Sequence, residues 1–172
     1  MMHEINENKN ITIIDDKETF NSIYSKTYVP LKYIEKIKKS NVLLLPYENY
    51  RDAVSYFFPE FTMEVYRYLN SNDKINAEIC IGDDEYKTLE LHSEVIIIPI
   101  MIINDVVLPI VLSMIAAWLY DKAKSMNKKV EDISTNVNII VEKNDKSKRI
   151  VYKGTVKNFY EVIKTINEEL HF

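Results

Sequence analysis

The apolar segment 95–120 is the feature that most limits what this chain can fold into. Its 26 residues read VIIIPIMIINDVVLPIVLSMIAAWLY, and only Asn104, Asp105 and Ser113 carry clearly polar side chains. A membrane-spanning helix needs about 20 apolar residues, so the segment is long enough to cross a bilayer. Asn104 and Asp105 would then lie near the middle of the span, where a charge costs roughly 2.5–3.5 kcal/mol. A single membrane span therefore fits this segment poorly.

Two prolines indicate that the segment divides into two elements. Pro99 and Pro109 both disfavour one continuous helix. We expect residues 95–103 to form a buried strand, and we expect Asp105 to cap a helix that runs from 106 to about 125. In that helix the apolar residues recur at intervals of three and four, which predicts one wide apolar stripe. They are Val107, Ile110, Val111, Met114, Ile115, Trp118 and Leu119.

Three environments are open to this helix. It can be the central core helix of the domain. It can also be covered partly by a partner protein or a second copy of the chain, in which case Ile110, Met114 and Trp118 are the expected contact residues. Attachment to a membrane through 95–120 is the third environment, and the charge and the prolines disfavour it.

Hydrophobic periodicity elsewhere predicts an α+β or α/β protein, with a mixed sheet packed against several helices. The continuous apolar run in 41–46 indicates a strand buried on both faces. The remaining strands are expected at 11–14, in a hairpin of 75–81 with 86–92, and in a hairpin of 137–141 with 149–153. Helices are expected from 15 or 16 to 24, from 30 to 39, at 51–58 and 60–70, and from 155 to 170.

The domain expectation follows from composition along the chain. Residues 1–10 are polar and lack periodicity, so we expect a mobile tail without the features of a signal peptide. Residues 11–127 form the main body. The charged stretch 121–132 is the best linker candidate. It leads to a β-hairpin–helix unit at 133–172, which we expect to belong to the same globular domain.

Composition excludes several classes of function. The chain has only two glycines, Gly82 and Gly154, so it cannot build the glycine-rich phosphate loops of P-loop or Rossmann proteins. The net charge is −4 and only three basic residues are arginine, which argues against nucleic-acid binding. The single cysteine, Cys80, suits a reducing compartment, so we expect a cytoplasmic protein in which Cys80 is a small core residue.

The turn YENYRD at 47–52 is the first candidate site, because it follows the carboxyl end of a buried strand. Tyr47 and Tyr50 offer stacking faces with polar tips, and Arg51 offers a planar fork for a carboxylate or phosphate. Glu48 and Asp52 could act as acid and base. The alternative is a solvated turn in which a carboxylate caps the next helix.

Two acidic clusters are weaker candidates for a metal site. Asp83, Asp84, Glu85 and Lys87 have the E-x-K spacing of some metal-dependent nucleases, but the acids also fill the expected turn. Glu90, His92 and Glu94 alternate along one strand face and could hold a metal, although no further histidine lies close in sequence. We expect a surface hairpin and a solvent-facing strand edge instead, with no metal, no cofactor and no catalytic residues.

Residues 41–70 (NVLLLPYENYRDAVSYFFPEFTMEVYRYLN) and 106–160, which end NIIVEKNDKSKRIVYKGTVKNFY, resemble small uncharacterised bacterial proteins whose genes accompany phage-defence systems or other mobile elements. The C-terminal hairpin and helix, with Lys153 and Gly154 before the helix, are similar to small adaptor modules of such systems. The resemblance brings no active-site residues with it and implies an accessory or partner-binding role.

Together these patterns favour a non-enzymatic accessory or assembly subunit that acts through protein–protein contacts with a partner or a second copy. Twelve tyrosines, a residue type enriched at interfaces, support this expectation. The alternatives are a small-ligand or nucleotide-processing enzyme that uses the 47–52 turn, and a membrane-associated protein held through 95–120.

Overall fold

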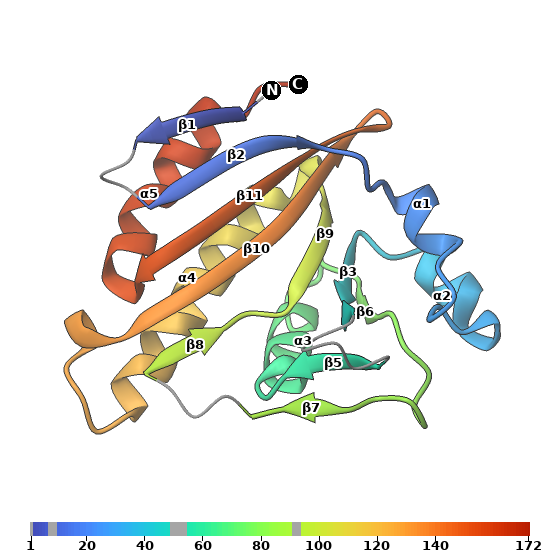
Figure 1. Cartoon of the computed structure of the whole chain (residues 1–172), viewed down its shortest axis with the longest axis horizontal. Coiled ribbons are helices and arrows are strands. Elements are labelled where there is room, and N and C mark those ends of the chain that lie inside the picture. Colours follow the sequence, from blue (N-terminus) through green and yellow to red (C-terminus); the bar gives the residue numbers. More distant parts are fainter. Residues whose placement is uncertain (1, 7–9, 49–54, 91–93) are drawn as a thin grey trace.

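A computed structural model of the chain describes residues 2–6, 10–48, 55–90 and 94–172. Within these residues the fold is α+β, as expected, and its main element is a mixed eight-stranded sheet (Figure 1). Seven strands follow the order β1-β2-β11-β10-β9-β3-β6, and β8 pairs with β10 beside β9. Their bounds are β1 Met2–Asn6, β2 Ile11–Asp16, β3 Val42–Leu45, β6 Ala77–Ile79, β8 Val95–Ile97, β9 Ile100–Asn104, β10 Ser134–Lys143 and β11 Lys146–Thr155.

The β10–β11 hairpin lies in the middle of this sheet. Asn144 and Asp145 join the two strands with φ angles of 51° and 65°. A two-residue hairpin turn of type I′ needs positive φ at both positions, which asparagine and aspartate tolerate well. β10 also runs parallel to β9, and β11 runs antiparallel to β2. The C-terminal unit expected at 133–172 therefore shares one sheet with the rest of the chain.

Three helices cover one face of the sheet. They are α3 (Thr62–Asn70), α4 (Leu108–Ser125) and α5 (Val156–Glu169). Alternate residues of β10, including Val137, Ile139 and Val141, are buried against this layer. Apolar residues that recur every two positions lie on one face of a strand, and those that recur about every 3.6 positions lie on one side of a helix. These two apolar surfaces pack against each other.

The other face is covered over part of its area. There α1 (Phe20–Tyr24), a 3₁₀ turn at Leu31–Tyr33 and α2 (Ile34–Lys38) contribute to a second core cluster with Leu43, Ile102 and Ile140. A small three-stranded sheet, β4-β5-β7, adds the buried Phe58 to this cluster. Its strands are β4 Tyr47–Glu48, β5 Tyr56–Pro59 and β7 Thr88–Leu89. In Figure 1 no helix lies in front of the middle of β2, β11 and β10.

Helix α4 is largely a core helix. Its buried residues are Leu108, Val111, Leu112, Ile115, Ala116, Trp118, Leu119 and Ala123. By length and composition, Asp105–Ser125 is the one described helix that could cross a membrane, but half of that window is buried inside the protein. Much of its apolar surface is therefore already used in packing, as expected for the core-helix environment.

The start of α4 differs from the prediction that Asp105 caps it. A short 3₁₀ turn, Asp105–Val107, precedes the helix, and the side chain of Asn104 accepts a hydrogen bond of 3.0 Å from the Val106 backbone N–H. Asn104 ends β9 in an extended conformation, which is the backbone geometry that a capping residue adopts. The cap is therefore one residue earlier than expected.

Three other local predictions are wrong. Met2–Asn6 form β1 on the edge of the sheet, although we expected residues 1–10 to be a tail without regular structure. The strand β5, Tyr56–Pro59, includes residues 56–58 of the range expected to be helical at 51–58. In the described parts of 75–81 and 86–92 the expected hairpin does not form, because β6 pairs with β3 and β7 pairs with β5. The helix α4 ends at Ser125, in agreement with the expected end at about 125, and a 3₁₀ turn at Val130–Asp132 then leads to β10.

Candidate functional site

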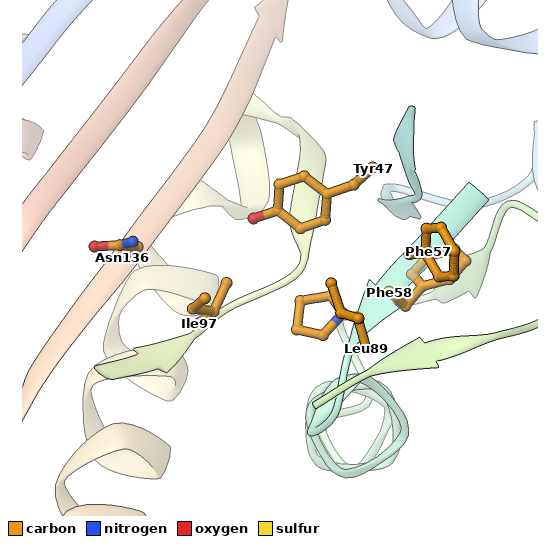
Figure 2. A pocket seen from close by; sticks show the side chains of 7 residues that line it. Tyr47, Phe57, Phe58, Leu89, Ile97 and Asn136 are labelled. Carbon is orange, nitrogen blue, oxygen red and sulfur yellow. The ribbon is translucent and has the colours of Figure 1, made fainter. Parts of the chain in front are cut away.

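A cavity of about 270 Å³ lies between the main sheet and the small sheet. Seven residues line it, and they come from β4, β5, β7, β8 and β10 (Figure 2). These residues are Tyr47, Phe57, Phe58, Pro59, Leu89, Ile97 and Asn136. The site is thus assembled from segments up to 89 residues apart in the sequence (136 − 47 = 89).

The small sheet supplies one wall. Tyr47 follows the buried strand β3 after Pro46, and it pairs with Phe57 across β4 and β5. β5 then pairs with β7 in parallel, so that Pro59 lies opposite Leu89. Phe58 is fully buried, and its backbone N–H donates to the Lys87 carbonyl at 2.9 Å.

The main sheet supplies the opposite wall through Ile97 and Asn136. These two residues are direct partners in the parallel pairing of β8 with β10. On the reverse face, the buried hydroxyl of Thr135 donates to the Ile96 carbonyl at 2.7 Å and fixes β8 to β10. Because side chains alternate along a strand, Ile97 and Asn136 then face the cavity.

The lining is apolar apart from two groups, the Tyr47 phenol and the Asn136 amide. In Figure 2 the Tyr47 ring extends from the small sheet toward β8 and β10, with its hydroxyl on the side of Asn136 and Ile97. None of the described lining residues is a carboxylate, a histidine, a lysine or a cysteine. The arrangement can hold an apolar group and orient it by a hydrogen bond, but the lining residues offer no acid–base pair.

The structure brings one residue of the predicted 47–52 site into this cavity. Tyr47 lines it, whereas Glu48 is exposed on β4 and pairs with Tyr56 in the strand register. Burial raises the pKa of the nearby Tyr28, and Glu48 is one of the negative groups that raise it further. Tyr50, Arg51 and Asp52 lie outside the described residues.

Asp83, in the acidic turn after β6, has a structural role. The Tyr33 hydroxyl donates to Asp83 Oδ2 at 2.8 Å, and the Glu85 N–H closes the turn on the Gly82 carbonyl. Among the described residues, no group of three acids, histidines or cysteines lies close enough to hold a metal ion.

The second proposed cluster is only partly described. Glu90 is exposed and Glu94 pairs with Lys128, while His92 lies outside the described residues. Cys80 is fully buried, in agreement with its prediction as a small core residue. Burial raises the pKa of its thiol to about 12, and Glu78 adds to the rise, so little thiolate forms at neutral pH.

The residues expected at an interface on α4 are oriented mainly inward. Trp118 is buried, with its ring 5.9 Å from the ring of Phe61, and Ile110 and Met114 are half-buried against the same core. The exposed large apolar side chains of this layer are Val106, Tyr120 and Tyr160.

Comparison of the chain with protein-family models, with curated proteins and with solved structures gave no match.

The six lining residues other than Tyr47 were not expected from the sequence to form a site. Phe57 and Phe58 lie in the range 51–58, which the sequence predicts to be a helix rather than a strand. Asn136 carries the one signal that could have been used. It lies on the polar side of an alternating strand, and such a side is open to solvent or to a cavity.

Proposed function

We propose that this protein is a non-enzymatic binding module that holds a small, mainly apolar ligand between its two sheets. The observation that carries the proposal is the composition of the 270 Å³ cavity. Its lining is aromatic and aliphatic except for the hydroxyl of Tyr47 and the amide of Asn136. Binding sites of this kind gain affinity from apolar burial and obtain orientation from a few polar groups.

Size and polarity narrow the ligand class. Cavities that bury drug-sized molecules start at about 300 Å³, so this cavity suits a smaller molecule. A charged ligand would lose its hydration without meeting an opposite charge from the lining residues. We therefore infer a neutral molecule with one hydrogen-bonding group that can meet the amide of Asn136 or the hydroxyl of Tyr47.

Ligand-observed NMR and calorimetry with indole and 1-decanol test this proposal. Ile97→Trp fills the cavity and is expected to weaken binding at least about tenfold. Val151→Trp is the matched control, because Val151 lies on the same face of the sheet, does not line the cavity, and receives the same bulk. Wild-type protein that binds neither probe, or equal binding by the two folded variants, contradicts the proposal.

A second function, assembly through protein–protein contacts, is favoured by a different observation. Val106 is 78% exposed and Tyr160 is 68% exposed, and both belong to the helical layer that contains α4 and α5. Exposed aromatic and aliphatic side chains of this size are typical of contact surfaces. Light scattering coupled to size exclusion tests it across a concentration series. A dimer that dissociates in the Val106→Ser, Tyr160→Ser double variant supports assembly, and a monomer at all concentrations contradicts it.

The resemblance of residues 41–70 and 106–160 to proteins of phage-defence and mobile-element systems suggests where such a module would work. In that setting we propose an accessory subunit in the bacterial cytoplasm, recruited or controlled by the ligand in the cavity. Deleting the gene in a strain that carries the surrounding system, then challenging the strain with phage, tests the setting separately from ligand binding.

A further inference from the structure

A second cavity, of about 390 Å³, lies on the other side of Phe58 and is built from different chemistry. Its walls come from α2 and the turn before it, from α3, from β6 and from the segment that follows β6. The lining residues are Tyr33, Lys36, Met63, Tyr66, Glu78, Ile79, Ile81, Asp83 and Tyr86. Three aromatic rings and three charged groups thus surround one space.

Two of the three tyrosines, Tyr33 and Tyr86, are held by contacts with neighbouring side chains. Tyr33 donates from its hydroxyl to Asp83 Oδ2 at 2.8 Å. Tyr86 packs its ring on Phe58, with centroids 5.2 Å apart and an angle of 26° between the planes. The hydroxyl oxygen of Tyr86 is buried and makes no hydrogen bond with the described residues. The neighbouring Thr62 hydroxyl donates to the Pro59 carbonyl at 2.7 Å.

The charges around this cavity are unbalanced. Glu78 and Asp83 bring two negative charges, and Lys36 brings one positive charge. Glu78 is half-buried, and no described cation lies within salt-bridge distance of its carboxylate. Burial raises the pKa of Tyr66, and the negative charge of Glu78 raises it further, which places that carboxylate near the phenol. A half-buried carboxylate among aromatic rings favours a cation.

The same protein shows this combination elsewhere with a lysine as the cation. Lys122 Nζ lies 4.2 Å from the centre of the Phe61 ring and 3.0 Å from Glu64 Oε2. An aromatic face and a carboxylate together hold that ammonium group. One face of Tyr33 is similarly approached by Lys32, whose Nζ is 5.3 Å from the ring centre.

We propose that the second cavity binds a small alkylammonium ligand, with Tyr33, Tyr66 and Tyr86 around the cationic group and Glu78 as its counter-ion. Alkylation of the nitrogen weakens the hydration of the ammonium group, so its transfer out of water costs less free energy. Attraction to the aromatic faces then offsets that cost. Lys36 at the rim opposes the cation and leaves room for an anionic or polar tail. This site does not depend on the proposed function of the first cavity.

Choline and its neutral isostere 3,3-dimethyl-1-butanol separate charge recognition from shape recognition. Calorimetry is expected to show binding of choline and at least about tenfold weaker binding of the alcohol. This comparison uses the unaltered protein, so it does not depend on the folding of any variant.

Two variants test the roles of Glu78 and Lys36, and a third is their control. Glu78→Gln is expected to weaken choline binding about tenfold, and Lys36→Gln is expected to tighten it severalfold because a repelling charge is removed. Glu35→Gln is the matched control, since Glu35 lies on α2 beside Lys36 but does not line the cavity. Circular dichroism confirms folding before each titration.

Three results overturn the proposal. The first is equal affinity for choline and the alcohol, or binding of neither. The second is an equal effect of Glu78→Gln and Glu35→Gln on choline binding. The third is binding of inorganic phosphate that is lost in Lys36→Gln, which would make this an anion site.

Discussion

The ring of Phe58 stacks on the ring of Tyr86 with centroids 5.2 Å apart, and each ring lines a different cavity. Phe58 belongs to the apolar cavity and is fully buried. Tyr86 belongs to the charged cavity and is half-buried. One aromatic pair is thus the partition between two sites of opposite chemical character.

Tyr86→Phe is expected to leave the free energy of unfolding unchanged or to raise it by up to about 1 kcal/mol. The Tyr86 hydroxyl is buried without a hydrogen bond to the described residues, so its removal ends a desolvation cost and keeps the stacked ring. Chemical denaturation followed by circular dichroism measures the change.

Tyr152→Phe is the matched comparison for this prediction. The hydroxyl of Tyr152 donates to the Thr155 carbonyl at 2.6 Å, so the same substitution is expected to cost about 1 kcal/mol there. A loss of stability in Tyr86→Phe as large as that in Tyr152→Phe would show that the Tyr86 hydroxyl has a stabilising partner.

Asn104→Ala is expected to lower the free energy of unfolding by about 1 kcal/mol, because the side chain caps the helical segment that leads into α4. Asp105→Ala removes a carboxylate from the first turn and is expected to cost only about 0.3–0.5 kcal/mol. Thermal unfolding of both variants shows which of the two side chains stabilises the start of the helical segment more. A larger loss of stability in Asp105→Ala would show that Asp105 is the capping residue, as we expected from the sequence.

Arg149→Met is expected to destabilise the fold by about 3 kcal/mol. Arg149 donates to Asp16 Oδ2 and to Asn138 Oδ1, both at 2.7 Å, and the Asp16 side chain is only 12% exposed. Removing the guanidinium leaves a largely buried carboxylate without its partner. Urea denaturation of the wild type and of Arg149→Met measures the difference in free energy of unfolding.

Lys128→Met provides the control for Arg149→Met. Lys128 pairs with Glu94 at the surface, where the two side chains are 44% and 64% exposed. Such pairs contribute about 0–1 kcal/mol. An equal loss of unfolding free energy in Arg149→Met and Lys128→Met would contradict the distinction between the buried and the exposed pair.

Stability is expected to fall between about pH 9 and pH 12 through Cys80. The pKa of the thiol is raised from 9.0 to about 12 in the folded protein, so the unfolded chain loses its proton first and the folded state is disfavoured as pH rises. One such proton contributes about 1.4 kcal/mol per pH unit within that window. Below pH 9 the contribution of Cys80 is constant.

Cys80→Ala isolates this contribution from the tyrosines that also titrate at high pH. The difference in unfolding free energy between wild type and Cys80→Ala is expected to shrink as pH rises from 9 to 12. The thiol reagent DTNB supplies an independent check, since it is expected to label Cys80 only after unfolding. Fast labelling of the native protein at pH 8 would contradict the buried environment of the thiol.

Much of the fold could be predicted because its signals are local. The run 42–45 is apolar at every position and forms a strand that is buried on both faces. The alternation of Val137, Ile139 and Val141 identified β10, and the stripe on 156–169 identified α5. Each of these patterns compares residues within a few positions of one another, which is the range that periodicity covers.

The errors occurred where pairing across the chain overrode local preference. Residues 56–58 belong to the range expected to be helical, yet β5 is fixed by β4 before it and by β7 about 30 residues after it. β1 forms although its sequence is polar, because an edge strand is held by backbone hydrogen bonds with β2. Periodicity carries no information about such partners.

The sequence by itself determined the fold class, the central apolar helix, the buried environment of Cys80 and the absence of glycine-rich phosphate loops. Those features depend on residue type and spacing along a short stretch of chain. Only the tertiary structure decided that Tyr47, Leu89, Ile97 and Asn136 line one cavity and that Tyr33, Tyr66 and Tyr86 line another. Both cavities are spaces left between sheets and helices, and their position follows from which strands pair rather than from any one segment.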